Sequence, residues 1–490
     1  MQMRITARLM PPLLAVLLGG CTVGPDFLRP AAPVTDHYTA SPLPAKTKGA
    51  NSAEGEEQIF VTGQDLPADW WKLFHCEALN GLVQQALAKS PGVAAAEATL
   101  RQARENSKAQ DGAVFPQIDL NASDTREKFS AAGFGQALAI PPSIFNLYNA
   151  SVNISYNLDL FGGTRRAIEG SAAEVEYQSY ELKAAHLALV SNLTTTAFKE
   201  AALRGQLEAT RGMIDAQGKQ LSIMEKQLAL GGTARADVIA ERKQFEQTKE
   251  TLPPIEKGLE QARNQLAVYA GKLPSESNLP KFQLADFTLP RKLPVSLPSS
   301  LVRQRPDIRA AEAKLHEASA EIGVATANLF PQFKISAAYG PETTEAHELF
   351  NSHSIVWSLA GSVTQPLFHG GELKAKRRAA KAAYDQAAAN YRQTVLQAFQ
   401  NVADTLKALE ADARTLEACA AANTQAKAAW KITKQQNNLG GASNLTLLDA
   451  RRQYQQTRFD LAQAQAARLA DTAALFSALG GGWWNQRGTQ

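Results

Sequence analysis

The chain of 490 residues repeats itself, and this internal repeat restricts its possible folds more than any other feature of the sequence. The segment Phe115-Pro116-Gln117 recurs 215 positions later as Phe330-Pro331-Gln332. A glycine pair, Gly231-Gly232, recurs 209 positions later as Gly440-Gly441, so the second copy is shorter between these two landmarks. Repeats of about 200 residues are large structural units, and we expect an architecture built from two of them.

The repeats and the proline-rich stretches around them divide the chain into six segments. Residues 22–68 contain six prolines, a composition typical of an extended tether, and we expect the packed part to begin near Trp70. The expected segments are a lipoprotein signal peptide at 1–20, an acylated extended tether at 21–68, a first repeat at 69–273, a proline-rich linker or irregular middle layer at 274–296, a second repeat at 297–480 and a C-terminal tail at 481–490.

The first twenty residues have the pattern of an export signal. Arg4 and Arg8 precede a short apolar run at 9–18, and Leu18-Gly19-Gly20-Cys21 provides a cleavage site with small residues. The apolar run is too short to span a bilayer. Because Cys21 directly follows the glycine pair, the stretch resembles a bacterial lipobox, which implies that Cys21 becomes the acylated first residue of the mature chain. An ordinary signal peptide with a chance cysteine is the alternative. A covalent lipid on Cys21 is the only cofactor that we expect.

Each repeat contains two segments in which apolar and polar residues alternate, the pattern of β-strands with two different faces. The clearest segment runs from Ser151 to Leu160. A half-exposed sheet of a soluble protein has the same alternation, so the pattern alone does not identify a membrane protein. The expected strands lie at about 116–125 and 149–160 in the first repeat and at about 331–340 and 354–366 in the second.

Long proline-free stretches with a helical pattern follow both strand pairs, at about 164–230 and 371–439. Uninterrupted helices of this length would each run roughly 100 Å, longer than a globular domain of this size needs. Each stretch ends at a glycine pair that can adopt the left-handed conformation, and Thr233 or Ser443 can cap the return helix. We therefore expect two helical hairpins with tips at Gly231, Gly232, Gly440 and Gly441. Apolar residues at seven-residue spacing predict supercoiled packing, at Leu207, Ile214, Leu221, Leu228, Val395, Val402, Leu409 and Leu416.

Four expected strands per chain require an oligomer if they cross a membrane. Closed membrane barrels begin at eight strands, and a four-stranded sheet would leave unpaired edges in lipid. After the signal, no stretch reaches the roughly 18 consecutive apolar residues of a membrane helix, so any further membrane contact must use strands. Two chains would give a barrel nearly filled by its own side chains, whereas three would give one wide enough for a lumen.

The composition argues against several classes of function. Lys+Arg 51 against Asp+Glu 47 gives a formal charge of only +4, without the basic surplus of nucleic-acid binders. The seven His and three Cys do not have the spacing of metal-binding motifs, and we expect no metal site. This expectation includes His347 and His353, in the connection between the second pair of strands. No nucleophile elbow, phosphate loop or dinucleotide fingerprint is present, so we expect no enzyme and no catalytic residues. The spacing leaves open whether Cys76 and Cys419 pair.

A series of short motifs, in order along the whole mature chain, resembles one known family. The chain is similar to the outer membrane factors (TolC-like proteins) of tripartite RND-type efflux systems, and among them to the NodT-like lipoprotein branch. The motifs are Cys21-Thr22-Val23-Gly24-Pro25-Asp26-Phe27, Trp70-Trp71-Lys72-Leu73-Phe74, Asp159-Leu160-Phe161-Gly162, Leu297-Pro298-Ser299-Ser300-Leu301, Arg305-Pro306-Asp307-Ile308-Arg309 and Leu445-Thr446-Leu447-Leu448-Asp449-Ala450.

This resemblance implies an α+β membrane protein. Its expected form is a homotrimer with a 12-stranded outer-membrane β-barrel, four strands from each chain, continued by a long periplasmic α-helical barrel. The expected location is the outer membrane of a Gram-negative bacterium. The implied partners are outer-membrane lipid, a periplasmic adaptor (membrane fusion) protein and an inner-membrane RND-type pump, without nucleic acid. The implied function is passive conduction of drugs or other small toxic compounds to the exterior.

The resemblance also implies a gate at the periplasmic helix tips. Family members close this mouth by drawing the tips together, commonly with Asp, Arg and Tyr side chains that link neighbouring helices. Solvated charges on exposed helix starts are the alternative interpretation. The candidate gate residues are Arg235, Asp237, Asp449, Arg451 and Arg452.

Two other functions are compatible with the sequence. One is a type I secretion exit duct for polypeptides on the same fold. The other is a periplasmic coiled-coil adaptor without a pore, which would lack strand pairs of membrane length. The sequence specifies neither the exported compound nor the partner pump, since selection in such assemblies lies mainly with the pump.

Overall fold

The computed structural model describes residues 22–52, 55–129, 143–276 and 278–485. The expected signal peptide and Cys21 lie outside these residues. The described chain forms two compact units, each taken separately below. The first unit draws on residues 1–29, 101–177 and 312–390, and the second on residues 30–100, 178–311 and 391–490.

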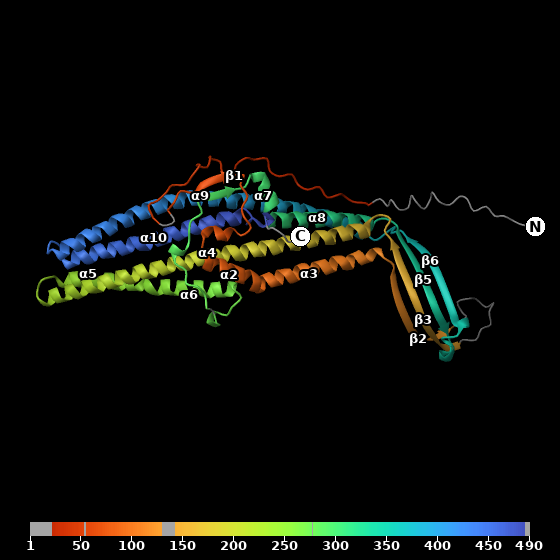
Figure 1. Cartoon of the computed structure of the whole chain (residues 1–490). Helices are drawn as coiled ribbons and strands as arrows, with labels where there is room; N and C mark the ends of the chain where they lie inside the picture. The colour runs from red at the N-terminus through yellow and green to blue at the C-terminus, as the bar shows by residue number, and fades with distance from the viewer. Residues whose placement is uncertain (1–21, 53–54, 130–142, 277, 486–490) are drawn as a thin grey trace, which may run out of the picture. The chain divides into compact units, whose positions relative to one another are not determined.

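The first unit contains a four-stranded antiparallel sheet (Figure 1). Its strands lie where the alternating pattern predicts them, although β3 begins at Ser143 rather than near 149, in a stretch where apolar and polar residues no longer alternate regularly. In spatial order the strands are β2 (Gln117–Phe129), β3 (Ser143–Leu158), β5 (Gln332–Thr343) and β6 (Ile355–Thr364).

Two helices of 67 residues each follow the strand pairs. They are α4 (Gly163–Ala229) and α9 (Glu372–Asn438), and each agrees with the predicted helix to within one residue at both ends. Both helices, like α3 (Pro91–Asp111) and α8 (Pro306–Ala327), contribute residues to both units. The seven-residue pattern on α9 is buried at all four predicted positions, as expected for a packed seam.

Both long helices end in the same backbone motif. Gly231 and Gly440 have positive φ angles of 75° and 80°. The amide of Gly232 donates to the carbonyl of Gln227 at 2.7 Å, and Gly441 makes the equivalent bond to Gln436 at 2.8 Å. These are the long hydrogen bonds of Schellman motifs, so the predicted role of the glycine pairs is confirmed.

The return helices differ between the repeats. The first return consists of α5 (Arg235–Glu250) and α6 (Leu252–Tyr269), which meet at Thr251, just before two prolines in the first turn of α6. The second is the unbroken α10 (Asn444–Ala478), capped by Ser443, whose hydroxyl accepts a hydrogen bond from the amide of Thr446. The predicted cap at Thr233 is wrong: Ala234 occupies the cap position and α5 has no side-chain cap.

The second unit has an aromatic core. Trp70, Phe74, Phe198 and Phe476 are at most 1% exposed and contact one another mainly edge to face. Residues of α2 (Glu77–Lys89), α7 (Pro298–Gln304), α4, α6, α9 and α10 belong to the same hydrophobic core. The chain also forms short 3-10 helices, η1 (Trp70–Phe74), η2 (Gly112–Val114), η4 (Pro274–Glu276), η5 (Leu284–Asp286), η6 (Ala346–Glu348), η7 (Ser352–Ser354) and η8 (Trp483–Asn485).

The prediction that packing begins near Trp70 is wrong, because part of the expected tether belongs to the second unit. Strand β1 (Ile59–Thr62) pairs in parallel with β4 (Lys292–Val295), which lies in the proline-rich stretch between the repeats. Gln58 and Leu66 are fully buried. Proline content does not reveal this pairing, since the two strands are more than 200 residues apart in sequence.

The described residues of the proline-rich stretch and of the tail are part of the second unit. Phe282 and Phe287, in the proline-rich stretch, are buried in the hydrophobic core of the second unit, which favours the expected middle layer over a free linker. In the tail, the indole Nε1 of Trp483 donates to the carbonyl of Gln304 at 2.7 Å. Cys76 and Cys419 are free thiols.

Candidate functional site

One face of the sheet carries rows of exposed apolar side chains. Leu120, Val152, Tyr339 and Trp357 are paired in register across all four strands. Directly paired residues project from the same face, so these four side chains form one continuous row. Leu120 is 81% exposed and Trp357 75% exposed. A neighbouring row consists of Ile118, Ile154, Ala337 and Leu359.

The opposite face is polar. Asp119, Asn153, Ala338 and Ser358 are paired across the four strands at the intervening positions. Successive residues of a strand point to opposite faces, so this row lies behind the apolar ones. The sheet thus presents an apolar surface on one side and a polar surface on the other, as a barrel wall between lipid and an aqueous lumen does.

The sheet has two open edges. Within the described residues, β2 pairs only with β3 and β6 pairs only with β5. Unpaired backbone N–H and C=O groups at such edges are a liability in water and costly in lipid. The strands have 13, 16, 12 and 10 residues, enough for the 9–11 residues of a membrane strand. These lengths contradict the alternative of a coiled-coil adaptor without membrane strands.

Helices do not provide a membrane span in the part of the chain that the structure describes: none is both long enough and apolar enough to cross a bilayer.

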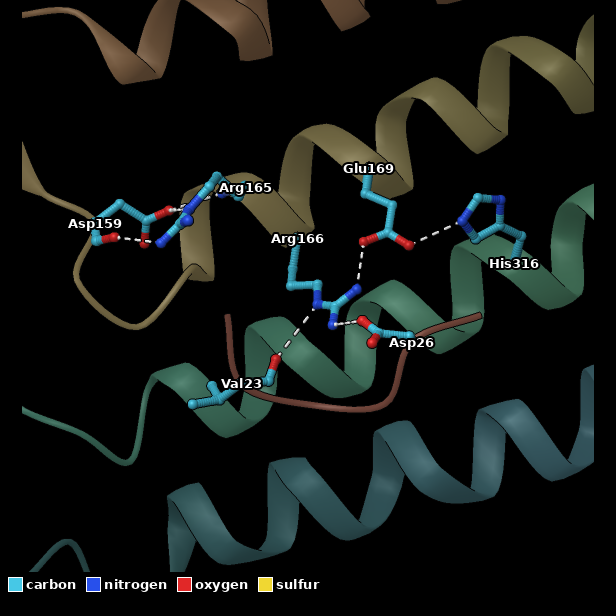
Figure 2. Close-up of polar contacts among 7 residues, drawn as sticks. All are labelled: Val23, Asp26, Asp159, Arg165, Arg166, Glu169 and His316. Carbon is cyan, nitrogen blue, oxygen red and sulfur yellow. Dashed lines mark hydrogen bonds and ion pairs between the residues drawn. The ribbon is translucent and has the colours of Figure 1, made fainter. Parts of the chain in front are cut away.

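A second candidate site lies where the N-terminal segment meets the start of α4 (Figure 2). We call residues 22–29 the N-terminal strap. The guanidinium of Arg166 on α4, with a side chain only 5% exposed, donates to Asp26 of the strap at 2.6 Å and to Glu169 of α4 at 2.6 Å. Its Nε also donates to the carbonyl of Val23 at 3.3 Å. One buried arginine therefore holds the strap by a side chain and by the backbone.

Close backbone packing and a ring contact complete the attachment of the strap. A Cβ on Gly24 would lie 2.5 Å from the Cα of Gly323 on α8, and the φ of Gly24 is 99°, so only glycine fits at this position. Phe27 stacks on His316 with ring centroids 4.4 Å apart, and His316 Nε2 lies 2.9 Å from Glu169 (Figure 2). The sequence motif around Cys21 pointed to acylation but gave no sign of this attachment.

The predicted gate residues lie at the starts of the two return helices. Arg235 and Asp237 begin α5, where both are exposed and, within the described chain, form no ion pair. On α10, Arg452 pairs with Asp449 at 2.7 Å within the same helix. Arg451 is different, because it pairs with Asp215 of α4 at 3.0 Å and so links two helices.

Asp215 was missed by the sequence reasoning, which considered only charges near the tips. A hydrogen bond from Lys219 and the charge of Arg451 lower the pKa of Asp215, so the carboxylate stays ionised. Asp215 and Lys219 line a groove of about 570 Å³ between α4 and α10, together with Ile214, Leu447 and Leu448. The pattern gave no signal for Asp215, because its partner is more than 200 residues away in sequence.

Known proteins resemble this chain over nearly its full length. The profile of the outer membrane efflux protein family matches residues 82–272 and 297–481. The solvent efflux pump outer membrane protein SrpC of Pseudomonas putida is 29% identical over 483 residues, which cover 97% of this chain and 98% of SrpC. The probable outer membrane lipoprotein SilC of Salmonella typhimurium is 29% identical over 478 residues, covering 95% of this chain and 97% of SilC.

A solved structure agrees with these sequence relationships. The outer-membrane channel OprN superposes with a TM-score of 0.81 at 28% identity, covering 94% of this chain and all of OprN. The two ranges matched by the family profile together span well over half of the chain and follow its two repeats. The protein therefore belongs to the outer membrane efflux protein family and is an outer-membrane channel of an efflux pump.

Proposed function

We propose that three copies of this chain form one twelve-stranded outer-membrane barrel, continued by a periplasmic barrel of α-helices. The observation that carries this proposal is the pair of apolar rows on one face of a sheet whose two edges are open. Four strands from each of three chains would pair every edge and enclose a polar lumen. A single chain would leave both edges unpaired in lipid.

In this proposal the barrel is the exit duct of a tripartite pump. A periplasmic adaptor and an inner-membrane RND-type pump deliver the compound, and the duct conducts it passively to the exterior. SrpC is named for solvent efflux. Small toxic organic compounds, including drugs, are therefore the proposed cargo.

Cys21 is the proposed site of lipid attachment. The strap begins one residue later, and its first residue, Thr22, packs against Gly162 in the turn between β3 and α4. One acyl chain binds a membrane only marginally, so the lipid would assist targeting and assembly of an inserted barrel. We expect Cys21→Ala to abolish incorporation of radioactive palmitate, and continued labelling of this variant would contradict the assignment.

The proposed gate contact is the ion pair between Arg451 and Asp215. Further proposed gate residues are Asp449, Arg452, Arg235 and Asp237. A partly exposed ion pair contributes only about 0–1 kcal/mol, but three copies act on one closed mouth. The gate would therefore open several-fold more often when this contact is removed from every chain.

Single-channel recording in planar bilayers tests the duct and its gate together. Purified wild-type protein should run as a heat-resistant trimer and show brief openings. Asp215→Ala and Arg451→Ala should each lengthen the open time several-fold, and the double variant should match either single one because one contact is lost. Lys407→Ala is the control, since Lys407 pairs with Glu410 within α9. A soluble monomer that never passes current would refute the proposed function.

A further inference from the structure

The connection between β5 and β6 brings together four side chains of metal-binding type. His347 Nε2 lies 3.5 Å from a carboxylate oxygen of Glu345 and 4.0 Å from Oε1 of Glu348. His353 Nε2 lies 3.6 Å from Oε2, the other oxygen of Glu348. Glu348 therefore lies between two imidazoles, with one carboxylate oxygen toward each.

These separations suit a shared ion better than direct hydrogen bonds. An N–H···O bond is normally about 2.7–3.2 Å long, and all three distances are longer. Two donor atoms bound about 2.1 Å from one ion at a tetrahedral angle lie about 3.4 Å apart. The ligand atoms of Glu345, His347 and Glu348 all lie within 4.8 Å of one another, so one ion can reach all three.

The backbone of this connection is fixed by local hydrogen bonds. The carbonyl of Glu348 accepts from the amide of Asn351 at 3.0 Å and from the hydroxyl of Ser354 at 2.9 Å. Ser354 is itself buried, although it lies in an exposed connection. Glu345 is held by its amide, which donates to the hydroxyl of Thr343 at 3.2 Å. The ligand-bearing residues are thus held close together, while their exposed side chains remain able to rotate onto an ion.

We propose that Glu345, His347, Glu348 and His353 form a binding site for a divalent transition-metal ion such as Zn²⁺ or Cu²⁺. Imidazole nitrogens select this class of ion, and the two carboxylates supply neutralising charge. Sequence reasoning expected no metal site because none of the usual motif spacings is present. The site instead depends on two 3-10 turns, η6 and η7, which bring His353 back toward Glu348.

The location of this site follows from the topology of the first unit. β5 is entered from α8 and β6 continues toward α9, so the β5–β6 connection lies at the end of the sheet away from these helices. If the sheet is part of the proposed outer-membrane barrel, the metal site lies at the extracellular mouth. Only this placement rests on the proposed function.

Calorimetric titration of the purified protein with Zn²⁺ tests the site. The protein must be chelator-treated and carry no polyhistidine tag. We expect one Zn²⁺ per chain, and Cu²⁺ bound in its place should show imidazole nitrogen coupling in its electron paramagnetic resonance spectrum. His347→Ala and His353→Ala should each weaken binding at least about tenfold, since even outer partners of metal ligands contribute this much.

The control is His369→Ala, an exposed histidine outside the cluster, which should leave binding unchanged. Glu345→Gln/Glu348→Gln removes the carboxylates at nearly constant shape and should also weaken binding at least tenfold. Absence of saturable binding by wild type, or unchanged binding by the His347→Ala/His353→Ala protein, would overturn the proposal. Zn²⁺ binding by a protein that passes no current would refute the proposed duct and leave the metal site standing.

Discussion

An Arg468→Met variant should unfold at a clearly lower temperature than the wild-type protein. Arg468 on α10 is fully buried in the second unit. Its guanidinium donates to the side chains of Gln58 at 3.3 Å and Thr47 at 3.0 Å, and to the carbonyl of Glu56 at 2.6 Å. Arg468 therefore fixes the segment before β1 onto α10.

Methionine would fill much of the same volume but could donate to none of these acceptors. Gln58 is buried, and its Oε1 would lose the donor Arg468 at a cost of about 1–3 kcal/mol, whereas Thr47 Oγ1 would still accept from the amide of Gln58. We expect a loss of roughly 2 kcal/mol, because removal of the guanidinium also relieves the cost of burying its unpaired Nη1, and this loss should lower the thermal midpoint by a few degrees. Arg414→Met on α9 is the matched control, because Arg414 is exposed and its loss should cost little. Equal midpoints for the two variants would show that Arg468 does not hold the N-terminal segment.

Local sequence was sufficient to predict the long helices and the strands. A helical pattern that continues over 67 residues without proline defines its own ends, and the glycine pairs mark where each helix must stop. Alternation within a strand likewise depends only on neighbouring residues. The Thr233 error has an equally local cause: the hydroxyl in the first repeat lies one position earlier, relative to its helix, than Ser443 in the second.

Contacts between distant segments could not be predicted in this way. The pairing of β1 with β4, the Arg451–Asp215 ion pair and the contacts of Arg468 all join residues more than 200 positions apart. Arginines such as Arg166 and Arg468 are typical of exposed helix faces, and nothing near them in the sequence indicates that they are buried. The residues near the helix tips could therefore be identified as gate candidates from the sequence. Their partner on another helix, Asp215, could be identified only from the structure.

An Arg166→Met variant should release the N-terminal strap from the first unit. Two hydrogen bonds of Arg166 hold the strap, one to the carboxylate of Asp26 and one to the carbonyl of Val23 (Figure 2). A hydrogen bond to a charged group contributes about 1.5–3 kcal/mol, but solvent screening lowers the contribution of Asp26, whose side chain is 90% exposed. A net loss of about 2 kcal/mol would raise the detached population roughly 30-fold.

Chymotrypsin can measure this release, because cleavage after Phe27 requires that its ring leave His316. When detachment is fast relative to cleavage, the cleavage rate follows the detached population, so it should rise by about the same factor. Arg165→Met is the matched control on the same turn of α4, because Arg165 pairs with Asp159 of the β3–α4 turn and its side chain is 43% exposed (Figure 2). Its loss should change the rate less than about fivefold. If both variants are cleaved at the wild-type rate, the strap is held by the packing of Gly24 on Gly323 and the stacking of Phe27, and the buried arginine is not its main attachment.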